Sequence, residues 1–280
     1  MPLFLVGLVL ASAFLHAAWN ALLKRAPNRE SAATGIMAVS LAVTALATPW
    51  LPGRAFPGLP ALAWGVAAGC FEGLYFLALA RALDSPSLGW SYTWMRGGSI
   101  LLVWPVSLLF LGEGLRLVPA CGVLGICGGL ALMGLTPGGL GPRRHLTWAI
   151  AGAAAIGSYT LCYKLSLLHG ASPVPLFALS MAVSLPFQVA VRIARGTFNR
   201  SNSSPAQWRL ILGAGLVSAA SFTLYLKVLT LGGVGAMATL RNTAVVFAVL
   251  LGWGLGERPS ARQWAGACLV AAGAVGLAWR

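Results

Sequence analysis

The sequence predicts an all-α polytopic membrane protein with ten transmembrane helices, arranged as two inverted five-helix repeats. Three observations support this fold class. Hydrophobic residues make up 58% of the 280 residues and charged residues only 9%, whereas a soluble domain has roughly 25% charged residues. Apolar runs of about 20 residues, each long enough to cross a bilayer, recur along the chain. The two halves of the chain also share a sequence pattern.

The predicted spans follow one another with short connections. Proline or a capping residue precedes several of them, as at Asp84-Ser85-Pro86 and Ser172-Pro173, which is typical of helix starts. The first span lacks a positively charged start and continues to Lys24, which favours a transmembrane helix over a signal peptide. The spans lie at roughly residues 3–23, 32–50, 60–81, 86–110, 117–136, 147–168, 173–192, 206–230, 234–255 and 261–279.

The internal repeat is carried by an arginine inside a span and a Leu-Gly-Glu sequence after it. Arg96 precedes Leu111-Gly112-Glu113, and Arg241 precedes Leu255-Gly256-Glu257. Other equivalent pairs are Leu74-Tyr75 with Leu224-Tyr225, and Gly122 with Gly266. A pattern that recurs at this spacing indicates that the chain contains two related units.

The repeats are expected at residues 1–137 and 146–280, joined by a loop at 138–145. Each repeat holds five helices, and five is odd, so the second repeat begins on the opposite face of the membrane. The repeats must then be antiparallel, related by a pseudo-two-fold axis in the membrane plane. Glu113 and Glu257 consequently fall on opposite faces, and we expect them to be turn residues rather than parts of one shared site.

The formal net charge of +14 comes mainly from loops on one predicted face. The opposite loops and the termini carry little beyond Arg54, Arg116 and Arg280. The positive-inside rule places the basic loops in the cytoplasm and both termini outside. We therefore expect a multi-pass protein of a bacterial inner membrane that contacts the lipid bilayer and no nucleic acid. Small-residue pairs such as Gly125/Gly129 favour tight packing within a monomer over a dimer contact.

Sequence signatures of enzymes and metal sites are missing. There is no HExxH, P-loop or GxSxG motif, and no carboxylates are clustered to hold Mg²⁺. The five cysteines form no CxxC pair and lie beside no histidine at metal-ligand spacing. We expect no cofactor, no metal and no enzymatic activity, with an integral-membrane lipid enzyme as a remote alternative.

Polar residues within spans are candidates for a functional site, because they are costly in lipid unless paired or used. Glu72 is the acidic residue near the middle of a span, and either a function or a salt bridge to Arg96 or Lys227 would explain it. Arg96 and Arg241 suit binding of a carboxylate, with a structural or gating role as the alternative. The other candidates are aromatic or polar residues, for which core packing is the alternative: Trp19, Asn20, Phe71, Tyr75, Ser158, Tyr159, Phe222, Tyr225 and Asn242.

The paired repeats, each with a Leu-Gly-Glu turn between its fourth and fifth helices, resemble the drug/metabolite transporter superfamily and its ten-helix EamA-type members. More narrowly, the aromatic-rich spans are similar to the YddG-type exporters of aromatic and other neutral amino acids. The resemblance implies alternating-access export of a small-molecule substrate at the repeat interface. It also implies that helices one, three, four, six, eight and nine surround a central cavity, with five and ten outside. Nucleotide sugars, purines and organic cations are alternative substrates, and both proton antiport and facilitated diffusion stay open.

Overall fold

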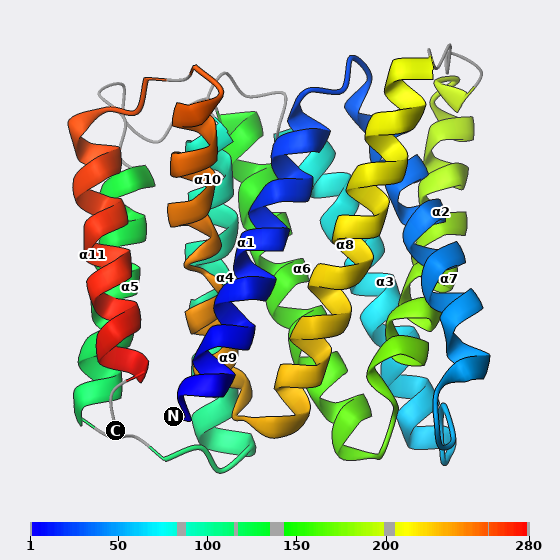
Figure 1. Cartoon of the computed structure of the whole chain (residues 1–280), viewed down its shortest axis with the longest axis horizontal. Coiled ribbons are helices and arrows are strands. Elements are labelled where there is room, and N and C mark those ends of the chain that lie inside the picture. The colour runs from blue at the N-terminus through cyan, green and yellow to red at the C-terminus, as the bar shows by residue number, and fades with distance from the viewer. Residues whose placement is uncertain are drawn as a thin grey trace.

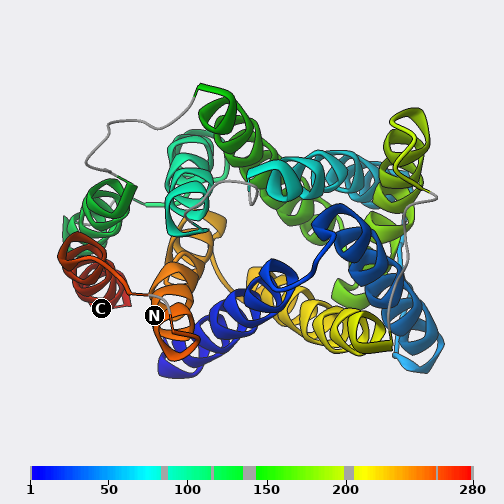
Figure 2. The same ribbon diagram turned by 90° about the horizontal axis from the view of Figure 1, so that it is seen from above.

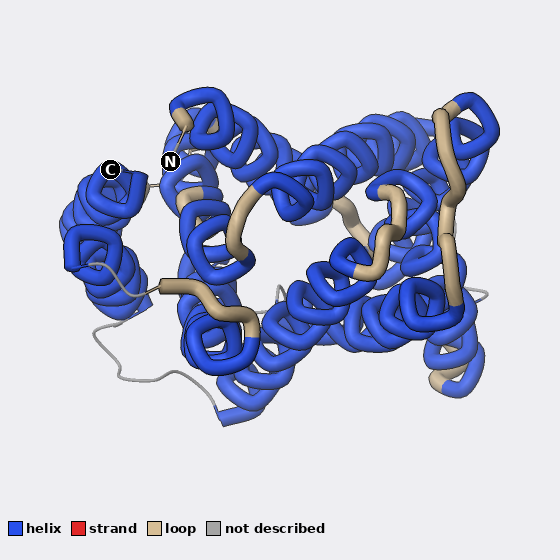
Figure 3. The backbone as a smooth tube through the Cα atoms, turned by 90° about the horizontal axis from the view of Figure 1, so that it is seen from below, coloured by secondary structure: helices blue, strands red, loops and turns tan. Residues whose placement is uncertain are grey.

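The computed structural model describes residues 2–82, 88–114, 117–134, 143–198, 205–256 and 258–278. Within these ranges all regular structure is helical and there is no strand (Figure 3). The helices are α1 (Leu3–Lys24), α2 (Arg29–Ala47), the 3₁₀ turn η1 (Thr48–Trp50), α3 (Leu59–Ala82), α4 (Leu88–Phe110), α5 (Leu117–Gly134), α6 (Arg143–Leu168), α7 (Pro173–Ala194), α8 (Pro205–Leu231), α9 (Val234–Arg241), α10 (Ala244–Gly254) and α11 (Ala261–Ala278).

Most of these helices are long and apolar enough to cross a membrane. Seven candidate spans occur among the described residues, and α9 with α10 counts as one of them, Val234–Gly254. Shorter apolar stretches lie in α4, at Trp94–Phe110, and in α5, at Ala120–Met133. With the 18-residue α11, the chain has the character of a polytopic membrane protein of about ten helices, which confirms the predicted fold class.

The ninth span lies where it was predicted, at Val234–Gly254, but it is interrupted between α9 and α10. The backbone N–H groups of Asn242 and Thr243 donate to the carbonyls of Thr239 and Leu240, at 3.0 and 3.1 Å. These bonds reach back three residues rather than four, as in a 3₁₀ turn. The hydroxyl of Thr243 also donates to the Leu240 carbonyl, at 2.8 Å, and such local side-chain bonds compete with the helix. Arg241 therefore stands at a helix end inside the bundle.

Helices of the first half pack mainly against helices of the second half. The main pairs are α3 with α6 and α7, α1 with α8 and α10, α2 with α7 and α8, and α4 with α6 and α9. By position in the two halves, α3 corresponds to α8, α6 to α1 and α7 to α2. The pair α3 and α6 then corresponds to α8 and α1, and the pair α3 and α7 corresponds to α8 and α2. Successive spans alternate in direction, so α1 and α6 run in opposite directions (Figure 1). This pairing is the one that an inverted repeat predicts.

Helices α5 and α11 form a separate pair at one end of the bundle (Figure 2), where the resemblance implied that helices five and ten would lie. Their backbones touch through glycines. A Cβ atom on Gly129 would lie 2.6 Å from the carbonyl oxygen of Gly266, and one on Gly273 would lie 2.6 Å from that of Gly122. Gly122 and Gly266 occupy equivalent positions in the sequence pattern of the two halves, so the two contacts correspond to each other. Small residues allow this close approach.

Glu30 joins three helices at the end of the bundle opposite the N-terminus. Its Oε1 accepts from Arg81 Nε of α3 at 2.8 Å and from Arg195 Nη1, just after α7, at 3.3 Å. All three side chains are partly exposed. Exposed ion pairs contribute only about 0–1 kcal/mol, so this group orients the helix ends more than it stabilises the fold.

Glu113 ties the other end of the bundle together. Its Oε1 accepts from the backbone N–H of Gly235, in the first turn of α9, at 3.1 Å. A Cβ atom on Gly233 would lie 2.6 Å from Glu113 Oε2, so the carboxylate needs a glycine there. Beside it, Lys164 Nζ donates to the carbonyls of Leu229 and Gly232, at 2.8 and 2.9 Å. The α4–α5 turn thus caps a helix of the other half; the equivalent Glu257 lies outside the described residues.

Replacing Glu113 by alanine should lower the melting temperature of the purified protein by a few degrees. The substitution removes the acceptor for an N–H group at the start of α9, and loss of a helix cap costs about 0.5–2 kcal/mol. Thermal unfolding followed by tryptophan fluorescence would measure the change. Glu113→Gln keeps an acceptor oxygen and should recover most of the loss. Equal losses in the two variants would contradict a capping role.

Candidate functional site

Two arginines from different halves of the chain meet at one histidine. His16 of α1 contacts Arg96 Nη2 of α4 through its Nε2, and Arg241 Nη2 lies 3.1 Å from its Nδ1. Trp19 Nε1 also donates to Nδ1, at 3.3 Å. His16 is fully buried, and each arginine is 2% exposed. We call His16, Arg96 and Arg241 the basic cluster.

The guanidinium of Arg241 also packs on aromatic rings of α8. It lies 3.9 Å from the ring centre of Tyr225 and 4.7 Å from that of Phe222. Cation–π contacts of this kind are worth about 2 kcal/mol or more when desolvated. Arg241 Nη2 lies 3.5 Å from Ser221 Oγ as well. The helix end at the break in the ninth span therefore places a cation against an aromatic wall.

Two asparagines link the backbones around the basic cluster. Asn242 Nδ2 donates to the carbonyl of Arg96 at 3.3 Å, which joins the interrupted span to α4. Asn20 Nδ2 donates to the carbonyl of His16 at 2.7 Å. The Asn20 Oδ1 atom is buried and has no hydrogen-bond partner among the described residues. This oxygen is free to accept a further hydrogen bond.

The carboxyl group of Glu72 lies in a pocket of hydroxyls rather than in a salt bridge. Its Oε2 is hydrogen-bonded to Tyr163 OH of α6 and to Ser180 Oγ of α7, while Oε1 is buried without a hydrogen-bond partner in the described part of the chain. Glu72, Tyr163 and Ser180 are all fully buried. The alternative considered from the sequence, a salt bridge to Arg96 or Lys227, is wrong, since Lys227 is exposed at the surface of α8 and hydroxyls occupy Oε2. We call these three residues the acidic cluster.

A chain of aromatic rings joins the two clusters. Tyr159 lies at its centre, with ring centres at 5.6 Å to Tyr75 and to Tyr163 and at 6.3 Å to Phe222. Phe222 is also in contact with the His16 ring, 5.5 Å between centres. The hydroxyl of Tyr159 is buried without a hydrogen-bond partner among the described residues. The arrangement is an amphipathic interior with bases at one end, an acid at the other and aromatic rings between them.

Most of the predicted site residues lie within this interior. The two exceptions are Phe71 and Ser158. Phe71 is 36% exposed at the helix surface, because it precedes Glu72 and successive residues of a helix face different directions. Ser158 is half-buried beside Tyr159 and makes none of the contacts above. The predicted residues that are buried here are Trp19, Asn20, Glu72, Tyr75, Arg96, Tyr159, Phe222, Tyr225, Arg241 and Asn242.

The sequence reasoning missed the contribution of α7. Ser180, Ser184 and Gln188 are spaced four residues apart and are buried, which is a one-faced polar stripe on an apolar helix. Ser184 Oγ donates to the Gly69 carbonyl at 2.6 Å, and Gln188 Nε2 donates to the Gly73 carbonyl. This spacing could have predicted that α7 faces the interior. His16 and Tyr163 were also left out of the predicted site.

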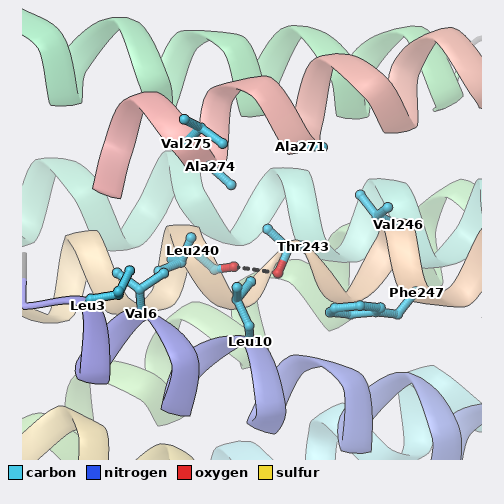
Figure 4. A pocket seen from close by; sticks show the side chains of 10 residues that line it. All are labelled: Leu3, Val6, Leu10, Leu240, Thr243, Val246, Phe247, Ala271, Ala274 and Val275. Carbon is cyan, nitrogen blue, oxygen red and sulfur yellow. Dashed lines mark hydrogen bonds between the residues drawn. The ribbon is translucent and has the colours of Figure 1, made fainter. Parts of the chain in front are cut away.

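A cavity of about 510 Å³ lies between α1, the break in the ninth span and α11 (Figure 4). Its walls are apolar apart from Thr243, whose hydroxyl is bonded to Leu240 (Figure 4). It includes none of the predicted site residues. The lining residues are Leu3, Val6, Leu10, Leu240, Thr243, Val246, Phe247, Ala271, Ala274 and Val275. Among the described residues, no group of three or more His, Cys, Asp or Glu is placed to hold a metal ion.

Comparison with known proteins gave similar solved structures and one matching family model. A solved crystal structure, one of 29 solved chains that match, superposes with a TM-score of 0.73 at 20% identity, covering 99% of this chain and 96% of that one; this likeness shows the fold. No curated protein sequence matches the chain significantly. The EamA-like transporter family model matches residues 143–279. The second half of the chain is thus similar to EamA-like transporters, which supports placing the protein in the drug/metabolite transporter superfamily.

Proposed function

We propose that this protein exports small zwitterionic solutes, aromatic and other neutral amino acids foremost, by alternating access between its two halves. The observation that carries the proposal is the buried interior with a base at one end and an acid at the other. An amino acid has a carboxylate, an ammonium group and an apolar side chain. The interior offers a complementary group for each of these.

The basic cluster suits the carboxylate. Three N–H donors, from Trp19, Arg96 and Arg241, point at the two ring nitrogens of His16. A neutral imidazole has only one acceptor nitrogen, so His16 can accept on only one side of its ring. A carboxylate can accept from two guanidinium groups and is the anion whose geometry they match best.

The acidic cluster and the rings suit the rest of the solute. Glu72 Oε1 and Tyr159 OH are buried polar atoms with no hydrogen-bond partner among the described residues, and an ammonium group could donate to both. The rings of Tyr75, Tyr159 and Phe222 form an apolar wall between the clusters. A wall of this kind favours solutes with aromatic or large apolar side chains.

Alternating access follows from where these groups originate. His16, Glu72 and Arg96 come from residues 1–137, whereas Tyr163, Ser180 and Arg241 come from residues 146–280. If these are inverted repeats, as the helix pairing supports, the site lies between two units that can rock against each other. The ends joined by Glu30 and by Glu113 then act as the two gates. The basic loops favour a cytoplasmic location for the Glu30 end, with the protein in a bacterial inner membrane.

Flux measurements in proteoliposomes test the proposal. Vesicles containing the purified protein and unlabelled tryptophan should take up labelled tryptophan, phenylalanine and leucine by counterflow faster than empty vesicles. A nucleotide sugar, a purine and a quaternary ammonium compound should compete poorly. If one of these three compounds shows counterflow and no amino acid does, the amino-acid assignment is overturned, although the protein is still a transporter.

A matched pair of variants on α3 tests whether the interior binds the solute. Tyr75→Ala should reduce tryptophan counterflow by roughly tenfold, because a lost aromatic contact is worth about 0.5–1.5 kcal/mol beyond its area. Phe71→Ala, one turn away at the exposed surface, should leave counterflow unchanged. Correct folding of both variants would be checked by size-exclusion chromatography. Normal flux in the double variant Glu72→Gln/Tyr75→Ala would remove both residues from the site.

A further inference from the structure

The three oxygen atoms of the acidic cluster form a closed ring of contacts. Tyr163 OH contacts Glu72 Oε2, Ser180 Oγ contacts the same Oε2, and Tyr163 OH lies 2.8 Å from Ser180 Oγ. Each contact is short enough for a hydrogen bond. The ring therefore has three edges, and each edge requires one hydrogen atom.

The two hydroxyls supply only two of these hydrogen atoms. Tyr and Ser each carry a single O–H donor, and an ionised carboxylate has none. With Glu72 ionised, one edge of the ring brings two oxygen atoms together with no hydrogen between them, which is repulsive. With Glu72 protonated, the carboxyl, tyrosine and serine hydroxyls each donate once and each accept once. The geometry fits the protonated acid.

The second oxygen of the carboxyl group leads to the same conclusion. Glu72 Oε1 is buried with no hydrogen-bond partner in the described part of the chain. Burying an ionised carboxylate with an unsatisfied oxygen inside a membrane is far more costly than burying a neutral carbonyl. Glu72 makes no salt bridge with a described residue. The carboxylate of Glu30, in contrast, pairs with Arg81 and Arg195.

The groups that face Glu72 come from several elements. Tyr163 and Tyr159 approach from α6, Ser180 approaches from α7, and the charge of Arg241 acts on it from the end of α9. Arg241 is held by His16 and the Tyr225 ring instead of by the carboxylate. A solute that draws Arg241 away or brings an ammonium group to Oε1 would change the equilibrium between the protonated and the ionised form of Glu72.

From this ring we infer that Glu72 holds a proton in the conformation described here and exchanges it for the ammonium group of the solute. The inference rests on the proposed transport function. One proton leaves the Glu72 carboxyl oxygen when one solute ammonium binds the resulting carboxylate. The carboxylate takes up a proton on the other side of the membrane after the solute has left. Export of one zwitterion is thereby coupled to entry of one proton.

Infrared spectroscopy tests the proton without any solute. The protein in phosphatidylcholine nanodiscs at neutral pH should show the carbonyl stretching band of a protonated carboxylic acid. The band should be absent in Glu72→Gln, unchanged in Glu30→Gln, and shifted in Tyr163→Phe, which keeps the carboxyl group but removes one hydrogen from the ring. Absence of the band in the unmodified protein, or its persistence in Glu72→Gln, would overturn the inference.

Transport measurements test the coupling separately. An inward proton gradient, imposed on vesicles loaded with labelled tryptophan, should accelerate efflux several-fold in the unmodified protein. The ratio of efflux with the gradient to efflux without it should fall to one in Glu72→Gln, whose counterflow at equal pH should also be weaker because an amide carries no charge to pair with the ammonium group. Lys227→Ala, at an exposed residue of α8, should keep both the ratio and the counterflow. Gradient-driven efflux that survives in Glu72→Gln would refute coupling at this residue. If no amino acid is transported by any variant, the proposed function fails, and the infrared band still decides whether Glu72 holds a proton.

Discussion

Arg241→Ala is expected to reduce tryptophan counterflow by roughly 100-fold. Arg241 is buried at a helix end, contacts His16 at 3.1 Å and lies 3.9 Å from the ring centre of Tyr225. Truncating one partner of a buried charged contact costs about 2–5 kcal/mol, and each 1.4 kcal/mol is about tenfold in affinity. The measurement is the concentration dependence of counterflow, which separates weaker binding from slower exchange.

Two further variants show whether the guanidinium itself is needed. Arg241→Lys keeps the positive charge but loses the planar group that can bind a carboxylate in two places and pack on a ring. It should recover only part of the loss. Lys227→Ala, which removes an exposed charge on α8, is the control and should transport normally. If Arg241→Lys behaves like the unmodified protein, charge alone explains the role of this residue.

Adding one methyl group between α5 and α11 should destabilise the protein measurably. A Cβ atom on Gly129 would lie 2.6 Å from the Gly266 carbonyl oxygen and 2.8 Å from the backbone N of Val270. Backbone atoms cannot rotate away, so Gly129→Ala must push the two helices apart. Overpacking of this kind costs about 1–3 kcal/mol. We expect the melting temperature in detergent to fall by roughly 3–10 °C.

The neighbouring glycine provides the matched control. A Cβ atom on Gly128 would meet only the end of the Leu269 side chain, at 3.6 Å, which is ordinary van der Waals contact. Gly128→Ala should therefore leave the melting temperature unchanged or raise it slightly, since alanine favours the helix. A fall of the same size in both variants would mean that the close backbone contact at Gly129 does not determine stability.

Hydropathy and spacing predicted the helical fold because lipid requires every backbone polar group to be bonded within its own segment. The cost of burying charge in lipid likewise predicted that Glu72, Arg96 and Arg241 would lie inside. The break in the ninth span was harder to predict. Asn242 and Thr243 are tolerated in many helices, and it is their backbone bonds to Thr239 and Leu240, three residues back, that show the interruption here.

The partners of the interior residues could not be predicted from single spans. A basic partner was one of the two explanations given for Glu72, because charge pairing is a common solution, whereas the structure uses hydroxyls from α6 and α7. Which face of α3 turns inward depends on the glycines against which α7 packs: a Cβ atom on Gly69 would lie 2.9 Å from the Ser180 carbonyl oxygen. That contact decides that Glu72 is buried and Phe71 is not.

The pairing of helices between halves has a consequence for how such a protein could arise. α1 and α3 pack on α8 and α6, and Glu113 caps a helix of the other half. A polypeptide of half this length would leave these surfaces facing lipid. It could cover them only by joining a second copy inserted upside down in the same membrane. If the halves are inverted repeats, an ancestor of half the length would have needed dual insertion, and joining the two copies in one chain would fix one copy in each orientation.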